Sequence, residues 1–203
     1  HQILHIWPFR HFEEKIEKMA YATKDVNVTS ISGVPTWNLL LFKRILEITG
    51  KNNLLEVWPN LELYYHGAVS FTPYREQFKQ LIPSEDMHYL ETYNASEGFF
   101  GIQDQEEYGD LLLMLDYGIF YEFLPLEHLY DENPKTLTLD EVELNKNYAL
   151  IISTNAGLWR YMIGDTIRFT SLAPYRIQIT GRSKHFINAF GEELIIDNAE
   201  RAL

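Results

Sequence analysis

The sequence contains no cysteine among its 203 residues. Disulfide frameworks, thiolate zinc sites and a catalytic cysteine are therefore excluded, and a reducing compartment suits the protein. No apolar run approaches the roughly 20 residues that a membrane-spanning helix needs, because Lys43 and Arg44 interrupt the longest candidate at 39–46. No signal peptide is recognisable, so we expect a cytoplasmic protein. The chain starts at His1 rather than Met, and we expect a preceding segment.

Basic residues are also few. The 17 Lys and Arg are outnumbered by 29 Asp and Glu, which gives a formal net charge of −12. Nucleic-acid binders usually carry a basic stripe that releases counterions from phosphate, and an anionic membrane repels an acidic surface. We therefore expect neither a nucleic acid nor a membrane as a partner. The sequence also lacks the GxxxxGK[ST] phosphate loop and the G-x-S-x-G nucleophile elbow.

What is present predicts an α/β first part over residues 1–95, with a mixed sheet and flanking helices. Apolar residues at helical spacing predict a helix over 12–24, and Pro35 and Gly50 can open and close a second. A third runs from about 72 to Pro83. Short β-like runs at 61–66 and 88–93 predict strands. One face of the second helix is expected in the core: Trp37, Leu40, Leu41, Ile45 and Ile48.

Residues 96–180 are expected to form a β-rich part, followed by a third part over 181–203. The predicted strands are 111–115, 119–124, 147–154, 158–163, 166–170 and 175–180. Asp116 to Gly118 is predicted to form a tight hairpin, and 131–138 a loop. Near the end, Asp197 and Glu200 resemble a capping box that opens a helix. Because the chain stops at Leu203, we expect that helix to be truncated.

The first segment that could carry chemistry is 91–103, ETYNASEGFFGIQ. A β-like run delivers Tyr93, then small polar residues, then Glu97 beside a glycine. Small residues let a ligand approach the backbone closely, and a carboxylate there could hold Mg²⁺, which prefers oxygen ligands. The alternative is a strand that ends in a turn with a solvated glutamate.

Further candidates lie at turns between β-like runs. Asp165, in GLWRYMIGDTIRFT, could accept hydrogen bonds from ribose hydroxyls, or the Gly-Asp pair could simply make a turn. Arg182 and Lys184 could face phosphate, form a flexible linker or be ordinary surface cations. The short segment His66-Gly67-Ala68 ends a predicted strand and precedes a helix start, a common place for ligands in α/β proteins.

Six segments in this order resemble the auxin-responsive-promoter family of acyl-acid amido synthetases, which belongs to the acyl-adenylate-forming enzymes. They are SGVPTWNLLLFKRILEITG, LEVWPNLELYYHGAVSFTPYREQF, ETYNASEGFFGIQ, LLLMLDYGIFYEFLP, STNAGLWRYMIGDTIRFT and ITGRSKHFINAFGEEL. The bacterial members are the most similar. The resemblance implies part of the large N-terminal lobe of such an enzyme, with residues 181–203 as the hinge and the start of the C-terminal lobe.

The resemblance also implies a two-step reaction. A carboxylate attacks the α-phosphorus of ATP, assisted by Mg²⁺, and gives an acyl-adenylate and pyrophosphate. An amine or amino acid then takes the acyl group and releases AMP. Catalysis of this kind is mostly positioning and charge stabilisation.

Roles carried over from the family fall on matching positions. Glu97 is expected to bind the metal, and Arg182 and Lys184 match the hinge and are expected to act in catalysis. The nucleotide-binding residues implied are Gly67, Ala68, Tyr93, Asn94, Ala95, Ser96, Asp165 and Arg168. Aromatic candidates for the acyl pocket are Phe99, Phe100, Tyr117, Phe120 and Trp159.

Two parts of the family pattern are not found. Its Ser/Thr/Gly-rich triphosphate loop lies upstream of His1, and most of its C-terminal lobe lies beyond Leu203. We therefore expect this piece to be inactive alone. Three alternatives remain open: an acyl-adenylate ligase that makes a thioester, a non-catalytic module that binds a nucleotide or acyl ligand, and a structural α/β domain without a site.

Overall fold

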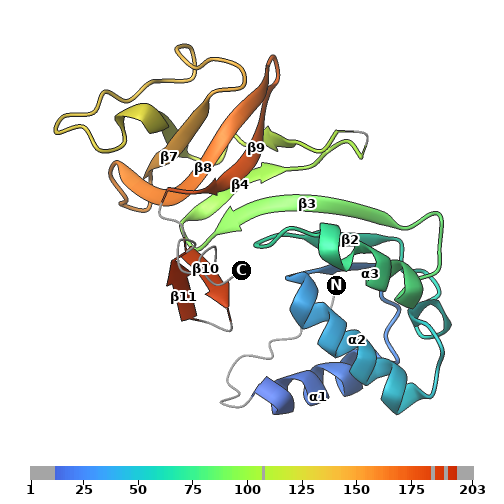
Figure 1. Cartoon of the computed structure of the whole chain (residues 1–203). Coiled ribbons are helices and arrows are strands. Elements are labelled where there is room, and N and C mark those ends of the chain that lie inside the picture. The colour runs from blue at the N-terminus through green and yellow to red at the C-terminus, as the bar shows by residue number, and fades with distance from the viewer. Residues whose placement is uncertain (1–11, 107, 184–185, 190–191, 196–203) are drawn as a thin grey trace. The chain divides into compact units, whose positions relative to one another are not determined.

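A computed structural model describes residues 12–106, 108–183, 186–189 and 192–195. The chain divides into two compact units, His1–Thr92 and Tyr93–Leu203 (Figure 1). In the described ranges, no helix has the length and apolar character needed to cross a membrane. The three-part division drawn from the sequence, with boundaries at 95 and 180, remains a prediction.

The first unit is α/β. Its helices are α1 (Phe12–Thr23), α2 (Pro35–Thr49) and α3 (Arg75–Leu81), with short 3-10 turns at η1 (Leu54–Glu56) and η2 (Thr72–Tyr74). Its strands are β1 (Ser30–Ser32), β2 (Leu63–His66) and β3 (His88–Ala95), and β3 crosses into the second unit. Strand β2 pairs in parallel with both β1 and β3. The predicted helices and strands of this part are thus present, and β1 is an addition.

The ends of α2 follow from its sequence. Pro35 opens the helix, where its missing N–H has no intrahelical partner to lose. Gly50 closes it in the left-handed conformation, at φ 65°, and donates its N–H to the Leu46 carbonyl over 2.9 Å. The predicted core face was only partly right, because Trp37 and Leu40 are 53% and 49% exposed. The buried residues of α2 are Pro35, Asn38, Leu39, Leu41, Phe42 and Ile45.

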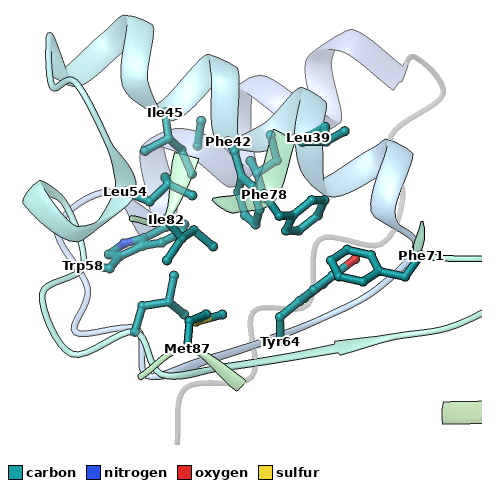
Figure 2. Close-up of a cluster of buried hydrophobic side chains, with 13 residues drawn as sticks. Leu39, Phe42, Ile45, Leu54, Trp58, Tyr64, Phe71, Phe78, Ile82 and Met87 are labelled. Atoms are coloured by element: carbon teal, nitrogen blue, oxygen red, sulfur yellow. The ribbon is translucent and has the colours of Figure 1, made fainter. Parts of the chain in front are cut away.

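Aromatic rings and aliphatic side chains share the core of the first unit (Figure 2). Phe78 of α3 is fully buried and stacks on Tyr64 of β2 with ring centroids 4.7 Å apart. It also meets Phe42 of α2 edge-on at 5.5 Å. Pairs of this kind add to the free energy gained from burying their area. Ring packing therefore contributes to attaching α2 and α3 to strand β2.

The second unit is built on antiparallel strands. They are β4 (Gly98–Ile102), β5 (Leu111–Leu113), β6 (Ile119–Pro125), β7 (Asn147–Thr154), β8 (Tyr161–Leu172) and β9 (Tyr175–Arg182). They follow the order β4-β5-β9-β8-β7-β6, and β10 (Phe186–Ala189) pairs separately with β11 (Glu192–Ile195). The 3-10 turn η3 (Leu126–His128) follows β6. Strand β7 is buried along most of its length because a separate apolar cluster packs on each of its faces.

Two turns expected from the sequence are not there. Strands β5 and β6 are not neighbours in the sheet, so Asp116 to Gly118 does not close a hairpin between them. Gly164 and Asp165 lie inside the continuous strand β8 rather than between two strands, and residues 158–160 precede that strand. The chain does not reverse at Gly164 because this residue, at φ 95°, accommodates an irregularity in the β7–β8 register.

Candidate functional site

Both carboxylate oxygens of Asp165, on β8, have partners within the second unit. The hydroxyl of Tyr93, near the end of β3, donates to Oδ2 over 2.8 Å. Arg182 Nε, on the neighbouring strand β9, lies 3.2 Å from Oδ1. The structure therefore brings together three residues that the sequence analysis had singled out separately.

The tyrosine partner of Asp165 is held as a hydrogen-bond donor. Tyr93 is only 5% exposed, and burial, followed by the negative charge of Asp165, raises the pKa of its hydroxyl well above the usual range. A carboxylate has about four acceptor positions, so one bond to Tyr93 and one ion pair leave room for further donors. The Asp165 carboxylate is thus fixed in orientation and still able to accept hydroxyl groups.

Local backbone structure places this carboxylate. Asp165 lies directly opposite Arg182 in the β8–β9 pairing. The carbonyl of the preceding Gly164 accepts the N–H of Ser183 over 2.7 Å, which fastens the end of β9 to the irregular part of β8. A Gly-Asp pair inside a strand is therefore used to aim a side chain, as bulges commonly do near sites.

The turn from β3 to β4 carries the predicted metal ligand. Ser96 and Glu97 form the turn, and Glu97 is half-buried. A Cβ on the following Gly98 would lie 2.8 Å from the Ile119 side chain, so glycine permits close packing there. Asn94 is exposed, and Ala95 packs on the core of the second unit.

The chemistry of this turn fits magnesium better than a resident all-protein metal. In the described part of the chain, no group of three potential metal ligands occurs. Mg²⁺ commonly takes one or two carboxylates and completes its shell with water and substrate phosphates. The single carboxylate of Glu97 fits that pattern.

In the first unit, Gly67 and Ala68 make a constrained bend after β2. A Cβ on Gly67 would lie 2.5 Å from the Thr92 carbonyl oxygen, so only glycine fits without a shift. Ala68 has φ 69°, a conformation rarely adopted by residues with a side chain. The close approach and the strained residue occur at the carboxyl end of a parallel strand, where α/β proteins commonly bind ligands.

His66 precedes this bend and belongs to the candidate segment His66-Gly67-Ala68, although the sequence indicated no role for the histidine itself. His66 is 4% exposed, and its Nδ1 has no hydrogen-bond partner among the described residues. Burial, and to a lesser degree the charge of Arg75, lowers the pKa of His66 to about 4. Its ring stacks on Phe71 at 4.3 Å. No pattern in the sequence separates such a histidine from a surface one.

Two of the predicted acyl-pocket aromatics line one open pocket of about 420 Å³ in the second unit, Phe120 and Trp159. Its other lining residues, which the sequence analysis missed, are Leu115, Gly118, Ile119, Ser153, Thr154 and Asn155. Tyr117 lies 5.9 Å from Phe99, ring to ring. Phe100 is fully buried in the core against Tyr93. The pocket has apolar walls and a short polar edge, a composition suited to a small organic group.

Of the other predicted cations, Arg168 contacts Gln178 rather than Asp165. Arg168 is exposed and donates to Oε1 of Gln178 on β9, with its nearest nitrogen at 2.7 Å. Lys184 lies outside the described residues.

Comparison with known proteins gives concordant results. The model of the GH3 family N-terminal domain matches residues 7–87, and that of the GH3 family central domain matches residues 112–182. An indole-3-acetic acid-amido synthetase of Arabidopsis thaliana is 34% identical over 134 residues, which are 58% of this chain and 21% of the relative. A jasmonoyl–L-amino acid synthetase of Nicotiana attenuata is 26% identical over 192 residues, which are 83% of this chain and 32% of the relative. The chain therefore spans less than a third of the length of these relatives.

Solved structures resemble the fold. The GH3.15 acyl acid amido synthetase matches with a TM-score of 0.64 at 15% identity, over 97% of this chain and 44% of the other. A 2-hydroxyisobutyryl-CoA ligase, solved with 2-HIB-AMP and CoA, matches with a TM-score of 0.62 at 11% identity, over 93% and 45% of the chains. The predicted α/β class, with a β-rich part following, is thereby confirmed.

Proposed function

The chain belongs to the GH3 family, and from this we propose that it is part of an ATP-dependent acyl-acid amido synthetase. In the first step, a carboxylate oxygen of the acid forms a bond to the α-phosphorus of ATP and pyrophosphate leaves. In the second, an amine or amino acid bonds to the acyl carbon, loses a proton, and AMP leaves. The parent enzyme performs the reaction in the cytoplasm.

The orientation of Asp165 carries the proposal. A buried tyrosine hydroxyl and a guanidinium hold its two oxygens, within a segment that matches the family's central domain. We assign to Asp165 the ribose hydroxyls of the nucleotide, because a fixed carboxylate with free acceptor positions is suited to a vicinal diol. Tyr93 orients the carboxylate, and Arg182 balances its charge.

Other residues take supporting roles in this proposal. Glu97 would hold Mg²⁺, which neutralises charge on the phosphates. The turn at 94–96 would follow the nucleotide, because small residues allow close approach. For Gly67 and Ala68, in the first unit, a role in nucleotide binding remains a prediction. Arg168 and Lys184 remain predictions as cations for the ribose or phosphate region.

We assign the acid to the open pocket beside Phe120 and Trp159. Its apolar walls would exclude water from the body of the acid, while Asn155 and Ser153 supply hydrogen-bonding groups at its edge. Tyr117 and Phe99, in contact with each other, are candidate neighbours of this pocket. Phe100 would support the site from the core beneath Tyr93.

The test is ATP–pyrophosphate exchange by the full-length parent enzyme with a panel of carboxylic acids. We expect acid-dependent exchange that falls about 100-fold or more in Asp165→Ala, which removes the group that positions the ribose, and in Glu97→Ala, which removes the ligand of Mg²⁺. The exposed residues Asp140 and Glu85 provide matched controls, and their alanine variants should retain exchange.

Two outcomes would contradict the proposal. If no acid in the panel supports exchange although ATP binding is measurable, the protein is a non-catalytic binding module. Exchange that survives in Asp165→Ala would place the ribose elsewhere.

A thioester-forming ligase is the second candidate, because the 2-hydroxyisobutyryl-CoA ligase shares the fold almost as closely. Trapping the activated acid distinguishes the two. Amide formation with amino acids but no thioester with coenzyme A is the expected result, and the reverse would favour the second candidate.

A further inference from the structure

Arg160 has an unusual backbone conformation. It lies between Trp159 and the start of β8, and its φ is 45°, in the left-handed region that favours glycine. A residue with a long side chain persists in this region only where its surroundings hold it there. The contacts of Arg160 provide that restraint.

Three separate segments hold Arg160. Its N–H donates to Ser153 Oγ on β7 over 2.9 Å. Its Nε donates to Glu122 Oε2 on β6 over 3.0 Å, and a terminal guanidinium nitrogen donates to Thr136 Oγ1 over 3.0 Å. Thr136 in turn donates to the other oxygen of Glu122 over 2.7 Å. We call Arg160, Glu122, Thr136 and Ser153 the Arg160 clamp.

Within the clamp, Glu122 is largely buried although Arg160 is exposed. The Glu122 side chain is only 13% exposed, whereas that of Arg160 is 63% exposed. An exposed ion pair by itself contributes little to stability. Here the guanidinium fork, the bound carboxylate and the backbone N–H act on one residue together, so their main effect is on its orientation.

Trp159 is adjacent to the clamp in sequence, and packing alone does not fix its orientation. Its side chain is 82% exposed, so packing does not fix the indole, yet it forms one wall of the open pocket. On the other side of Trp159, Leu158 is fastened to Thr154: the Leu158 carbonyl accepts the Thr154 N–H over 2.9 Å. The exposed tryptophan is therefore held between two anchored neighbours.

We propose that Arg160 is a positioning residue: the clamp sets Trp159 as a wall of the pocket and thereby determines which acids the enzyme prefers. This rests on the proposed function for the reaction, but the hold on Trp159 can be measured without any reaction. The clamp acts through the tryptophan and does not touch the acid.

The first measurement is fluorine NMR of the full-length protein labelled with 5-fluorotryptophan. The Trp159→Phe variant assigns the Trp159 resonance by its disappearance. In Arg160→Gln and Glu122→Gln, we expect this resonance to shift while those of Trp37 and Trp58, in the first unit, stay in place. Arg44→Gln is the matched control, because it breaks an arginine–glutamate pair of the same kind, Arg44 with Glu17, in the first unit.

The second measurement is pyrophosphate exchange with the acid panel. We expect Arg160→Gln to raise KM for the preferred acid about ten-fold, an effect of misplacing a positioning group, with KM for ATP unchanged. Trp159→Phe should raise it similarly, and the double variant should be no worse than Trp159→Phe alone. Should Arg160→Gln fail to fold, Arg160→Lys keeps the charge, loses the fork and should show the same pattern more weakly.

A Trp159 resonance that does not move in folded clamp variants would overturn the proposal. Additive effects in the double variant would also overturn it, because they would mean that Arg160 acts independently of Trp159. Equal rises in KM for acid and ATP would do the same, because the effect would not be specific to the acid pocket. If the wild type shows no exchange with any acid, the proposed function fails, and the NMR experiment still decides whether the clamp positions Trp159.

Discussion

The two units treat buried polar groups in different ways. In Tyr93–Leu203, Arg176 is 7% exposed and lies 2.9 Å from Asp104 and 3.1 Å from Asp110. Asp165 is likewise held between Tyr93 and Arg182. Removing one partner of such a cluster leaves a charge that has lost its compensation.

In His1–Thr92 two buried polar groups sit among aromatic rings without an ionic partner. The Nδ1 of His66 and the hydroxyl of Tyr89 have no hydrogen-bond partner among the described residues. Both rings stack on Phe71, at 4.3 and 5.2 Å. Both units have apolar cores, but the comparison teaches that the first unit buries a neutral histidine among rings, whereas the second also pairs opposite charges at Arg176.

The sharpest test of ring packing is Phe78→Ala. Phe78 is fully buried and contacts the rings of Tyr64, Phe42 and Phe71. We expect the free energy of unfolding to fall by about 3–5 kcal/mol, the usual cost of emptying such a position. Urea denaturation followed by the fluorescence of buried Trp58 measures it. Tyr21→Ala, at a 54% exposed position of α1, is the control and should change little.

Acid should weaken the first unit through His66. Its pKa is lowered from 6.5 to about 4, so the unfolded chain binds a proton between these values and the folded chain does not. This contribution to stability is complete above pH 6.5, is lost as pH falls toward 4, and amounts to at most about 3 kcal/mol.

The measurement is urea denaturation of the first unit, followed by Trp58 fluorescence, at a series of pH values in wild type and His66→Gln. Because Glu91, opposite His66 on β3, has its pKa raised by burial, it works in the other direction in both proteins and cancels in the difference. Identical pH dependence in the two proteins would show that His66 is not the titrating group.

Breaking the charge cluster should affect the second unit alone. Arg176→Ala leaves Asp104 and Asp110 without their guanidinium, and we expect a loss of about 2 kcal/mol, less than for a fully buried pair because Asp104 is partly exposed. Hydrogen exchange of β9 amides should speed up while that of α2 does not. Lys135→Ala, which removes an exposed ion pair with Glu141, is the control. Equal acceleration in both units would contradict the separation.

The sequence predicted well the features that depend on neighbouring residues. Helix α2 lies where Pro35 and Gly50 delimit it, and α3 follows the Thr72-Pro73 signal. It predicted poorly the features that depend on distant pairing. Nothing in 111–124 indicates that β9, β8 and β7 come between β5 and β6 in the sheet order, because that is decided by strands that follow later in the chain.

The candidate site shows the same limit. Tyr93, Asp165 and Arg182 were each recognisable within a family segment, and their meeting required the β8–β9 register and the course of β3. Arg160 also lies in a recognised segment, together with Ser153. Its other two clamp partners, Glu122 and Thr136, come from two other parts of the chain. The resemblance could therefore indicate positions, whereas contacts between them required the fold.

The smallest expected effect comes from replacing a glycine. Comparing two glycines separates the contribution of backbone conformation from that of packing. Gly50 ends α2 at φ 65° with nothing near an added Cβ, and Gly109, in the second unit, is equally open but has no left-handed φ. Gly50→Ala should cost about 1 kcal/mol through backbone strain alone, whereas Gly109→Ala should be close to neutral. Urea denaturation compares the two variants. Equal costs would mean that local backbone conformation does not determine where α2 ends, and that ring packing in the first unit holds the helix regardless of its cap.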